Sequence, residues 1–556
     1  MHCNTEMNRT VRVSPLKRRL RVVLCLVIIL LNFNSFSQTI IAGPIVGAVT
    51  STTAQMKFIL DKPIEGFVKV SNQPILNKNG KINEQVNTEN SILIRFFPFD
   101  SSDKVTVFNF DKLNSNTVYY YYLSYGNSEI TGSFKTFPKP NTQSNFTFTF
   151  GSCTENFKND SVFVAMQKVH PDFFVHLGDW TYPDHEAYPD IPTNNAHRFF
   201  VADPKEIEES FIIRYNLPNL KKLLQTTPVD YVFDDEDGVW DDFSKHTYCD
   251  LHLKNGITTI NEIPFPDSLR TNLLESYHQY FPGYINPEQP KEAYHSFMYG
   301  NTEFFFIDTR STRSPNSESF FPAKKNKWKY KVSNGHNILD SVQLDWLLTS
   351  LKNSKADWKI ILSGTSFNKS YKKIIDVCLL KAVQNRKLPN GMTGAYVAAS
   401  MSSMWFSFPE TQGKLINFCR ENKIKNVMVC SGDVHTSGID NGKNAGFPEL
   451  MSANLAQENT KLASIVTNDL KMKLWNEGGQ GIHNNNFKDA FGKVEVFGKD
   501  SIRMSCIDKD DKLICSYTMN DGFLPKKYNI KRHSKITFGN KIRAFLKLLR
   551  IGFSRL

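Results

Sequence analysis

The feature that most constrains this 556-residue chain is the stretch from Asp172 to Tyr182, which reads Asp-Phe-Phe-Val-His-Leu-Gly-Asp-Trp-Thr-Tyr. Its apolar run is typical of a buried strand, and Asp179 follows that run directly after a glycine. Because α/β folds place their sites at the carboxyl ends of strands, Asp179 is delivered to such a position. A buried carboxylate there is costly unless a cation meets it. The stretch predicts a metal ligand at Asp179, with a capping aspartate as the alternative.

Five further strand-like runs end in polar residues that can ligate metals or bind anions. These ends are Gly151-Ser152-Cys153, Asp234-Asp235-Glu236-Asp237, Asp308-Thr309-Arg310, Ser363-Gly364-Thr365 and Ser431-Gly432-Asp433-Val434-His435. If the runs share a sheet, their ends meet at one edge and form an acidic pocket that needs cations. Carboxylates, a phenol, a thiolate and an imidazole suit iron, manganese, zinc or calcium. Two ions bridged by one aspartate would activate a water and neutralise a phosphate during in-line displacement.

Length and composition set the outer bounds. The chain has room for two or three domains. Its net charge is +12, but the excess gathers at the two ends, and residues 523–556 hold ten Lys or Arg and no Asp or Glu. We therefore expect no nucleic-acid-binding module. The cysteines show no CxxC and no dense framework, which excludes a disulfide-built fold. Cys506 and Cys515 are a candidate disulfide pair across a late hairpin.

Residues 1–38 have the pattern of a signal peptide. A basic region that includes Lys17 and Arg21 precedes an apolar run from Val22 to Leu31, and small residues suited to cleavage follow near Ser37. The apolar run is short for a membrane span, although an uncleaved signal anchor is the alternative. Either interpretation predicts that the protein is exported, to the periplasm, the outer surface or the medium.

Residues 39–140 are expected to form a fibronectin-like β-sandwich. Short strand-like runs are broken by polar turns, and an aromatic run of four tyrosines suits a sandwich strand. The expected strands are 48–60, 66–70, 92–97, 104–108, 118–123 and 133–136. Residues 138–141, which contain two prolines, are the expected linker.

From residue 141 to residue 522, apolar strand-like runs alternate with helical stretches, as in α/β domains. Helices are expected at residues 161–169, 205–216, 342–353 and 413–422. Residues 370–410 and 455–490 are rich in Asn, Gly, Ser and Met and are expected to be long loops. Loops of that size in a compact domain usually serve as lids or substrate walls.

The strand-end motifs together resemble the PhoD-like family of alkaline phosphatases and phosphodiesterases. Their order and rough spacing match, and Cys153 together with Asp179 and Tyr182 is what separates this family from other metallophosphoesterases. The resemblance implies a four-layer α/β/β/α metallophosphoesterase domain over residues 141–522. It also implies a hydrolase that cleaves phosphate monoesters, diesters or both, using a water activated by metals.

The resemblance further implies a ferric ion (Fe³⁺) and calcium ions (Ca²⁺), although other divalent metals remain open. Cys153, Asp179 and Tyr182 match the iron-binding motif, with the tyrosine as phenolate and Asp179 as the bridge between ions. Asp235, Asp433 and His435 match the remaining metal-binding segments. Catalysis is expected to depend on Asp179, Asp235 and His435.

This chain departs from the family pattern in one segment. Glu236 stands where the family usually has His, and Asp241 stands where it has Asn, with Asp242 as a neighbouring candidate. Both changes add negative charge, which would tighten calcium binding, change the choice of metal or repel an anionic substrate. Because of this departure, the identity of the second metal and the preference for monoesters or diesters stay open.

Four further positions near these motifs have plainer interpretations. Asp234 is expected to be a ligand or to hydrogen-bond the main chain behind the ligands. His176 lies within a strand pattern and is expected to make a core hydrogen bond. Asp308 and Arg310 would either contact phosphate or, as we favour, form an ion pair that supports the pocket.

The tail from residue 523 to residue 556 predicts a basic amphipathic helix. Ile542, Phe545, Leu546, Leu549 and Phe553 fall at helical spacing, with Arg543, Lys547 and Arg550 on another face. Such a helix can lie on anionic lipid. The alternatives are a helix docked on its own domain or a solvated tail.

The functional alternatives stay open at this point. The expected substrate is a small phosphate ester or a phospholipid, and the expected state is a monomer. A phospholipase-type enzyme or a nucleotide phosphodiesterase is the second interpretation. The third is a non-catalytic surface-binding protein that kept the fold, which the extra acids at Glu236 and Asp241 favour.

Overall fold

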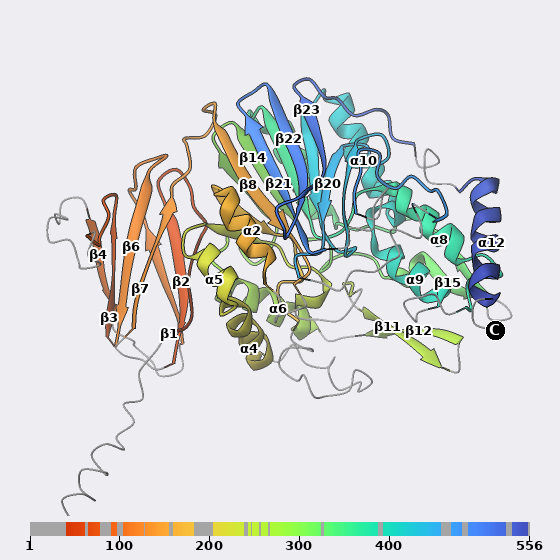
Figure 1. The fold of residues 1–556 in the computed structure, drawn as a ribbon, viewed down its shortest axis with the longest axis horizontal. Helices are drawn as coiled ribbons and strands as arrows, with labels where there is room; N and C mark the ends of the chain where they lie inside the picture. Colours follow the sequence, from red (N-terminus) through yellow and green to blue (C-terminus); the bar gives the residue numbers. More distant parts are fainter. Residues whose placement is uncertain are drawn as a thin grey trace, which may run out of the picture.

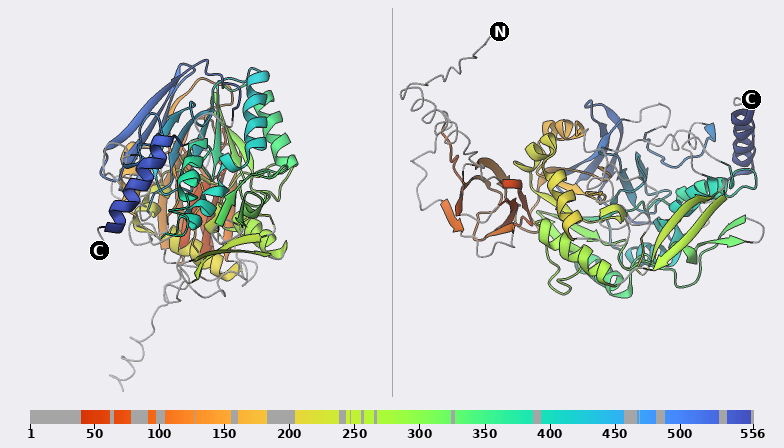
Figure 2. Two further views of the ribbon diagram at one scale, coloured as in Figure 1. Left: turned by 90° about the vertical axis from the view of Figure 1, so that its right-hand side faces the viewer. Right: turned by 90° about the horizontal axis from the view of Figure 1, so that it is seen from below.

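The computed structural model describes residues 40–61, 65–77, 91–96, 104–126, 128–154, 160–182, 204–237, 243–245, 247–254, 257–264, 267–323, 327–386, 393–456, 467, 469–480, 488–529 and 536–553. The predicted signal peptide, Asp241 and Asp242 lie outside the described residues. A β-sandwich forms one end of the molecule, and a larger body with two central sheets follows it (Figures 1 and 2).

The sandwich consists of two antiparallel sheets, as the turn-punctuated sequence predicts. One sheet has the order β1 (Ile40–Gly47), β2 (Ala54–Leu60), β5 (Val105–Phe110). The other has the order β4 (Ser91–Phe96), β3 (Gly66–Ser71), β6 (Val118–Tyr125), β7 (Ser128–Lys135). The prediction of one strand over 48–60 is wrong, because the Thr50 hydroxyl accepts from the Thr53 amide and closes a turn between β1 and β2. That the sandwich is of the fibronectin type stays a prediction.

The larger body contains two six-stranded sheets. The first has the order β10 (Val229–Tyr231), β9 (Phe173–His176), β8 (Asn145–Gly151), β21 (Ala490–Phe497), β22 (Ser501–Asp508), β23 (Leu513–Asn520). The second has the order β13 (His295–Tyr299), β14 (Thr302–Ile307), β17 (Trp358–Ser363), β18 (Val427–Ser431), β20 (Pro448–Ser452), β19 (Ser437–Asn441). Strands β8, β9 and β10 are mutually parallel, and so are β14, β17, β18 and β20. The idea that the six motif strands could share one sheet is therefore wrong, since three lie in each sheet.

The two sheets pack face to face through aromatic side chains. The ring of Phe304 in the second sheet lies 5.3 Å from the rings of both Phe148 and Phe173 in the first. Helices α2 (Val162–Val169), α4 (Pro204–Tyr215), α5 (Pro218–Leu224) and α6 (Asp267–Tyr280) share an apolar cluster on the outer side of the first sheet. Helices α7 (Ser341–Asn353) and α10 (Pro409–Glu421) pack on the second sheet. The result is four layers in the order helix, sheet, sheet, helix.

The four predicted helices are present as α2, α4, α7 and α10, because each has the apolar spacing that a buried helix face needs. The prediction that 370–410 is a long loop is wrong. This segment contains α8 (Lys372–Cys378) and α9 (Gly394–Ser400), and α9 begins where the Thr393 side chain accepts from the Tyr396 amide. Ile374, Ile375 and Ala398 anchor both helices in a buried cluster. The loop predicted at 455–490 is described only in part.

The remaining elements are short or peripheral. They are the hairpins β11 (Thr247–Lys254) with β12 (Ile257–Pro264) and β15 (Phe320–Ala323) with β16 (Lys327–Tyr330), the 3₁₀ turns η3 (Asp235–Asp237), η4 (Asn316–Glu318), η5 (Lys369–Tyr371), η6 (Met401–Ser403) and η7 (Trp405–Ser407), and the final helix α12 (Phe538–Phe553). Cys506 faces Cys515 across β22 and β23, as the hairpin prediction requires, but both are free thiols, so the predicted disulfide is wrong. Of the helices among the described residues, none combines the length and apolarity that a membrane span needs.

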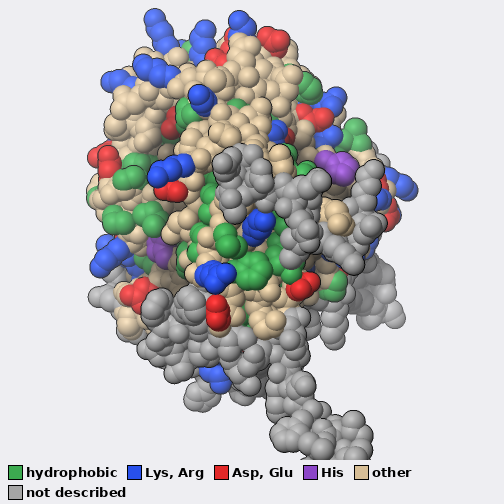
Figure 3. All heavy atoms as spheres, turned by 90° about the vertical axis from the view of Figure 1, so that its left-hand side faces the viewer, with side chains coloured by type: hydrophobic (Ala, Val, Ile, Leu, Met, Phe, Trp, Pro, Cys, Tyr) green, Lys and Arg blue, Asp and Glu red, His purple; other side chains and the backbone are tan. Residues whose placement is uncertain are grey.

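The surface charge on the sandwich end of the molecule is mixed. Lys and Arg side chains there are dispersed among acidic and hydrophobic ones (Figure 3). That the net charge of +12 does not mark a nucleic-acid-binding surface stays a prediction.

Lys57 of β2 fastens the sandwich to the larger body. Its buried ammonium group donates to the main-chain carbonyls of His278, Gln279 at 3.2 Å and Phe281 at 2.8 Å, where α6 ends. A cation at this position complements the partial negative charge of the helix terminus. Burial nevertheless lowers the pKa of Lys57 from 10.5 to about 8.

This pKa shift predicts a pH-dependent contribution to stability. Lys57 has its ordinary pKa in the unfolded chain, so between pH 8 and 10.5 the unfolded state binds more protons and stability rises with pH. We expect the unfolding free energy of the wild type, relative to Lys57→Met, to rise over this window by on the order of 1–3 kcal/mol. Urea denaturation at several pH values measures it. Exposed Lys352→Met serves as the control, and a pH-independent difference for Lys57→Met would contradict the prediction.

Candidate metal centre

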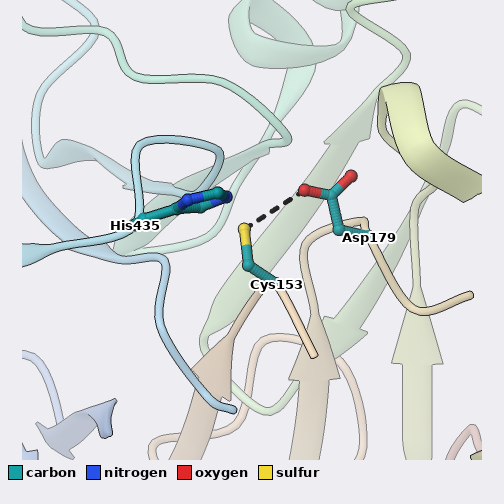
Figure 4. A group of neighbouring side chains, drawn as sticks. All are labelled: Cys153, Asp179 and His435. Carbon is teal, nitrogen blue, oxygen red and sulfur yellow. Dashed lines mark hydrogen bonds between the residues drawn. The ribbon is translucent and has the colours of Figure 1, made fainter. Parts of the chain in front are cut away.

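Three side chains predicted as ligands meet where strands of both sheets end. Cys153 follows β8, Asp179 follows β9, and His435 follows β18. The Cys153 thiol donates to Asp179 Oδ2 at 3.2 Å, and the imidazole of His435 points toward both (Figure 4). One potential ligand atom from each residue lies within 4.8 Å of the other two. Sulfur, oxygen and nitrogen donors from distant parts of the chain thus converge.

A second group of carboxylates shares Asp179. Oxygen atoms of Asp179, Asp234 and Asp235 lie within 4.8 Å of one another, and all three residues are buried. Asp433 is connected to the same region, because the Thr365 hydroxyl donates to its Oδ2 at 2.7 Å and its main-chain N–H donates to the Ser152 hydroxyl at 3.2 Å. Asp179 is therefore common to both groups, and its role as a bridge between ions stays a prediction.

The backbone of the candidate ligands is unusual. Cys153, Asp179, Asp433 and His435 have φ angles of 63°, 54°, 78° and 46°, in the left-handed region that side-chain-bearing residues rarely adopt. Such conformations cost on the order of 1–3 kcal/mol each and cluster at functional sites. The backbone conformations that place these four side chains together therefore lower the stability of the fold.

Gly178 permits the close approach of two of these loops. Its φ is +93°, and a Cβ atom there would lie 2.2 Å from the Cβ of Asp234. A glycine is therefore required if the loop after β9 is to pack against the loop after β10. This steric requirement explains why a glycine precedes Asp179 in the sequence.

Burial and mutual repulsion shape the electrostatics of the pocket. Burial, and then the charges of Asp235, Asp234, Asp237 and Asp433, raise the pKa of Asp179 well above its ordinary value. Burial, and then Asp179, likewise raise the pKa of the Cys153 thiol. A cation would reverse these shifts by stabilising the ionised forms. The mixed donor set and the dense negative charge fit iron or a similar borderline ion at the first group and a hard, oxygen-binding ion such as calcium at the second.

Arg310 lies among the acidic loops and pairs with their carboxylates rather than with Asp308. Its guanidinium contacts Asp234 through Nε and through Nη2 at 3.0 Å, Asp235 at 3.2 Å and Asp433 at 3.4 Å. Asp308 instead accepts the main-chain N–H groups of Arg310 and Ser311, both at 2.9 Å. The interpretation of an ion pair between Asp308 and Arg310 is therefore wrong. Arg310 supports the pocket by partly neutralising its acids.

Asp237 is a residue of the site for which the sequence pattern predicts no role of its own. Its buried carboxylate accepts the main-chain N–H groups of Asp179 at 2.8 Å, Trp180 at 2.6 Å, Thr181 at 2.9 Å and Asp234 at 2.7 Å. It thus ties the loop after β9 to the loop after β10. The signal in the sequence is its place at the end of the Asp234–Asp237 run, but nothing in that run distinguishes it from its neighbours.

The other predicted residues have mixed outcomes. Asp234 binds Arg310 through its side chain, so the prediction that it would hydrogen-bond the main chain is wrong. His176 is a core residue as expected, but neither ring nitrogen has a hydrogen-bond partner among the described residues, and its ring packs against Trp180 instead. Tyr182 is buried three residues beyond Asp179, and its role as a phenolate ligand stays a prediction. Glu236 donates its main-chain N–H to Asp179 at 3.3 Å.

Comparison with known proteins gives three findings. A family profile described as PhoD-like phosphatase matches residues 148–494. Alkaline phosphatase D of Bacillus subtilis (strain 168) is 26% identical over 344 residues, which are 60% of this chain and 53% of that protein. The chain thus spans about half the length of this curated relative. A solved structure described as that of PhoD aligns with 94% of this chain and 99% of its own, at a TM-score of 0.59 and 16% identity, which is a likeness of fold.

Proposed function

Because this chain belongs to the PhoD-like phosphatase family, we propose that it is a metal-dependent hydrolase of phosphate esters. The observation that carries the proposal is the convergence of Cys153, Asp179 and His435 with the carboxylates of Asp234 and Asp235. These residues follow the ends of four strands, β8, β9, β10 and β18, and four of the candidate ligands have strained backbone conformations. Burying several carboxylates together costs free energy unless cations neutralise them, so a pocket of this kind favours metal binding.

The proposed ligands divide into two sets that share Asp179. Cys153, Asp179 and His435, with Tyr182, would hold ferric iron; Asp179, Asp235 and Asp433, with Asp241, would hold calcium. When bound, such ions polarise a water and stabilise negative charge that develops on phosphate oxygens. We assign the catalytic role to Asp179, Asp235 and His435, through the ions that they hold.

The side chains around the proposed ligands determine the orientation of the ligand carboxylates and offset part of their charge. Arg310 holds Asp234, Asp235 and Asp433 in fixed orientations and offsets part of their charge, so that an anionic substrate is repelled less. Thr365 fixes Asp433 by a hydrogen bond of 2.7 Å. The proposed substrate is a small phosphate monoester or diester. We also propose export, because the basic and apolar run from Lys17 to Leu31 has the pattern of a signal peptide.

Hydrolysis of p-nitrophenyl phosphate and bis(p-nitrophenyl) phosphate tests the function directly. We expect turnover of at least one ester, a fall of at least about a hundredfold after chelation, and recovery when iron and calcium are restored. Elemental analysis of the purified protein provides the metal content. A protein that holds neither metal and cleaves neither ester would instead be a binding protein on this fold.

A second candidate is an enzyme that acts on phospholipid. The observation that favours it is the amphipathic helix α12, which exposes apolar side chains. Rates on phospholipid dispersed in vesicles and on the two soluble esters distinguish the candidates, since a phospholipase would prefer the vesicles.

A further inference from the structure

Helix α12 exposes an apolar stripe on the outside of the molecule. Phe538, Ile542 and Leu546 are 78%, 43% and 52% exposed, and their spacing of four residues places them on one face of the helix. The helix lies at the end of the molecule opposite the sandwich, with one side open to solvent (Figures 1 and 2). A single exposed leucine is ordinary on a protein surface, but three large apolar side chains in line are not.

The opposite face of the same helix is docked. Ala544 is buried in the apolar cluster that contains Tyr371, Met451 and Trp475, and Asn540 is also buried. The helix therefore does not hang free in solvent. Its orientation is fixed, and the body of the protein holds the stripe outward.

Basic side chains flank the stripe. Lys541 and Arg543 are exposed on α12, and the chain from residue 523 to residue 556 contains ten Lys or Arg and no acid. A basic amphipathic helix with Phe, Ile and Leu on its apolar face is the kind that lies in the plane of a membrane interface. Two signals, apolar and basic, are what stable peripheral attachment requires.

We propose that α12 is a docking surface for an anionic lipid bilayer, with Phe538, Ile542 and Leu546 entering the headgroup region and Lys541 and Arg543 contacting lipid phosphates. The charge of the tail favours a bilayer over an apolar groove of another protein, because every charged side chain in residues 523–556 is positive. This inference is independent of the proposed function, since it concerns attachment and not turnover.

The buried cluster beneath α12 extends toward the candidate metal centre. The cluster that holds Ala544 also packs against Val434, which stands between Asp433 and His435. The buried cluster on which α12 docks therefore reaches the segment that carries Asp433 and His435. A bilayer bound at α12 would lie on the side of the body where α8 and α9 also pack.

Cosedimentation of the full chain with vesicles tests the proposal. We expect binding to vesicles of mixed phosphatidylcholine and phosphatidylglycerol, weaker binding to phosphatidylcholine alone, and a decline at high salt. The variants Ile542→Ser with Leu546→Ser, and Lys541→Glu with Arg543→Glu, should each lower the partition coefficient about tenfold. All chains carry residues 1–38, so any binding through that segment is common to them.

Two matched controls separate lipid binding from general effects. Leu93→Ser removes a leucine that is 54% exposed on the sandwich, and Lys352→Glu reverses an exposed charge on α7; both should bind as the wild type does. Unchanged thermal unfolding shows that the α12 variants still fold. Equal binding by all variants would overturn the proposal. So would a dimer, seen by light scattering, that the Ile542→Ser and Leu546→Ser changes abolish, because the stripe would then be covered by a second copy.

Discussion

Replacement of Asp179 by asparagine is expected to lower kcat/KM for p-nitrophenyl phosphate by at least about a thousandfold. Asp179 is the one residue shared by both groups of candidate ligands, so the change removes a charge from both. Asparagine has the same shape and tolerates the left-handed backbone that this position requires, with φ of 54°. The fold should therefore survive while the metal affinity falls. Steady-state kinetics and elemental analysis of the same preparation measure both effects.

The control for this prediction is Asp345→Asn, which removes a carboxylate that is exposed and pairs only loosely with Lys414 at 3.5 Å. It should leave the kinetics and the metal content unchanged. An Asp179→Asn protein that keeps wild-type turnover and wild-type metal content would show that the converging ligands are not the catalytic centre.

Replacement of Asp237 by alanine is expected to have the second largest effect. Four buried main-chain N–H groups lose their acceptor at once, and each unsatisfied buried donor costs about 1–3 kcal/mol. Partial relaxation limits the total, so we expect the free energy of unfolding to fall by on the order of 3–5 kcal/mol. Activity should fall with it, because the loop that carries Asp179 is no longer tied to the loop that carries Asp234 and Asp235.

A second buried aspartate provides the matched control. Asp440 accepts the main-chain N–H groups of Gly442, Asn444 and Ala445 at 3.0–3.1 Å, at the end of β19 that lies away from His435. Asp440→Ala should lower the unfolding free energy to a similar degree and leave kcat and metal content intact in the folded protein. If Asp237→Ala also kept its metal and its kcat below the unfolding transition, Asp237 would be a structural residue only.

The strand ends are predictable because a short physical rule covers them. A buried strand followed closely by an acid, a thiol or an imidazole recurs often enough in this chain that Cys153, Asp179 and His435 can be grouped from the sequence alone. Helices such as α7 can be predicted for the same reason, since their apolar spacing is local. What these predictions share is that the decisive residues are close together in the sequence.

The partners of Arg310 and Asp237 could not be predicted, because they depend on the packing of separate loops. Arg310 and Asp234 are 76 residues apart and meet only because β10 and β14 belong to two stacked sheets. The expectation that the six strands share one sheet was wrong for a related reason. Buried parallel strands are continuous apolar runs in both sheets, so the sequence does not show to which sheet a strand belongs. The helices in 370–410 were missed because tertiary burial, rather than propensity, forms α8 and α9.

The pairing of β8 with β21 has a consequence for biosynthesis. Cys153 follows β8, and one of the two neighbours of β8 in the sheet is β21, which comes from residues 490–497, much later in the chain. Until the ribosome has synthesised β21, one edge of β8 has no partner and can pair with a wrong strand. The nascent chain thus holds all of its proposed ligands before it can assemble the sheet that positions the first of them. Loss of the residues from 490 onward would therefore leave the sheet incomplete, even though every proposed ligand would remain.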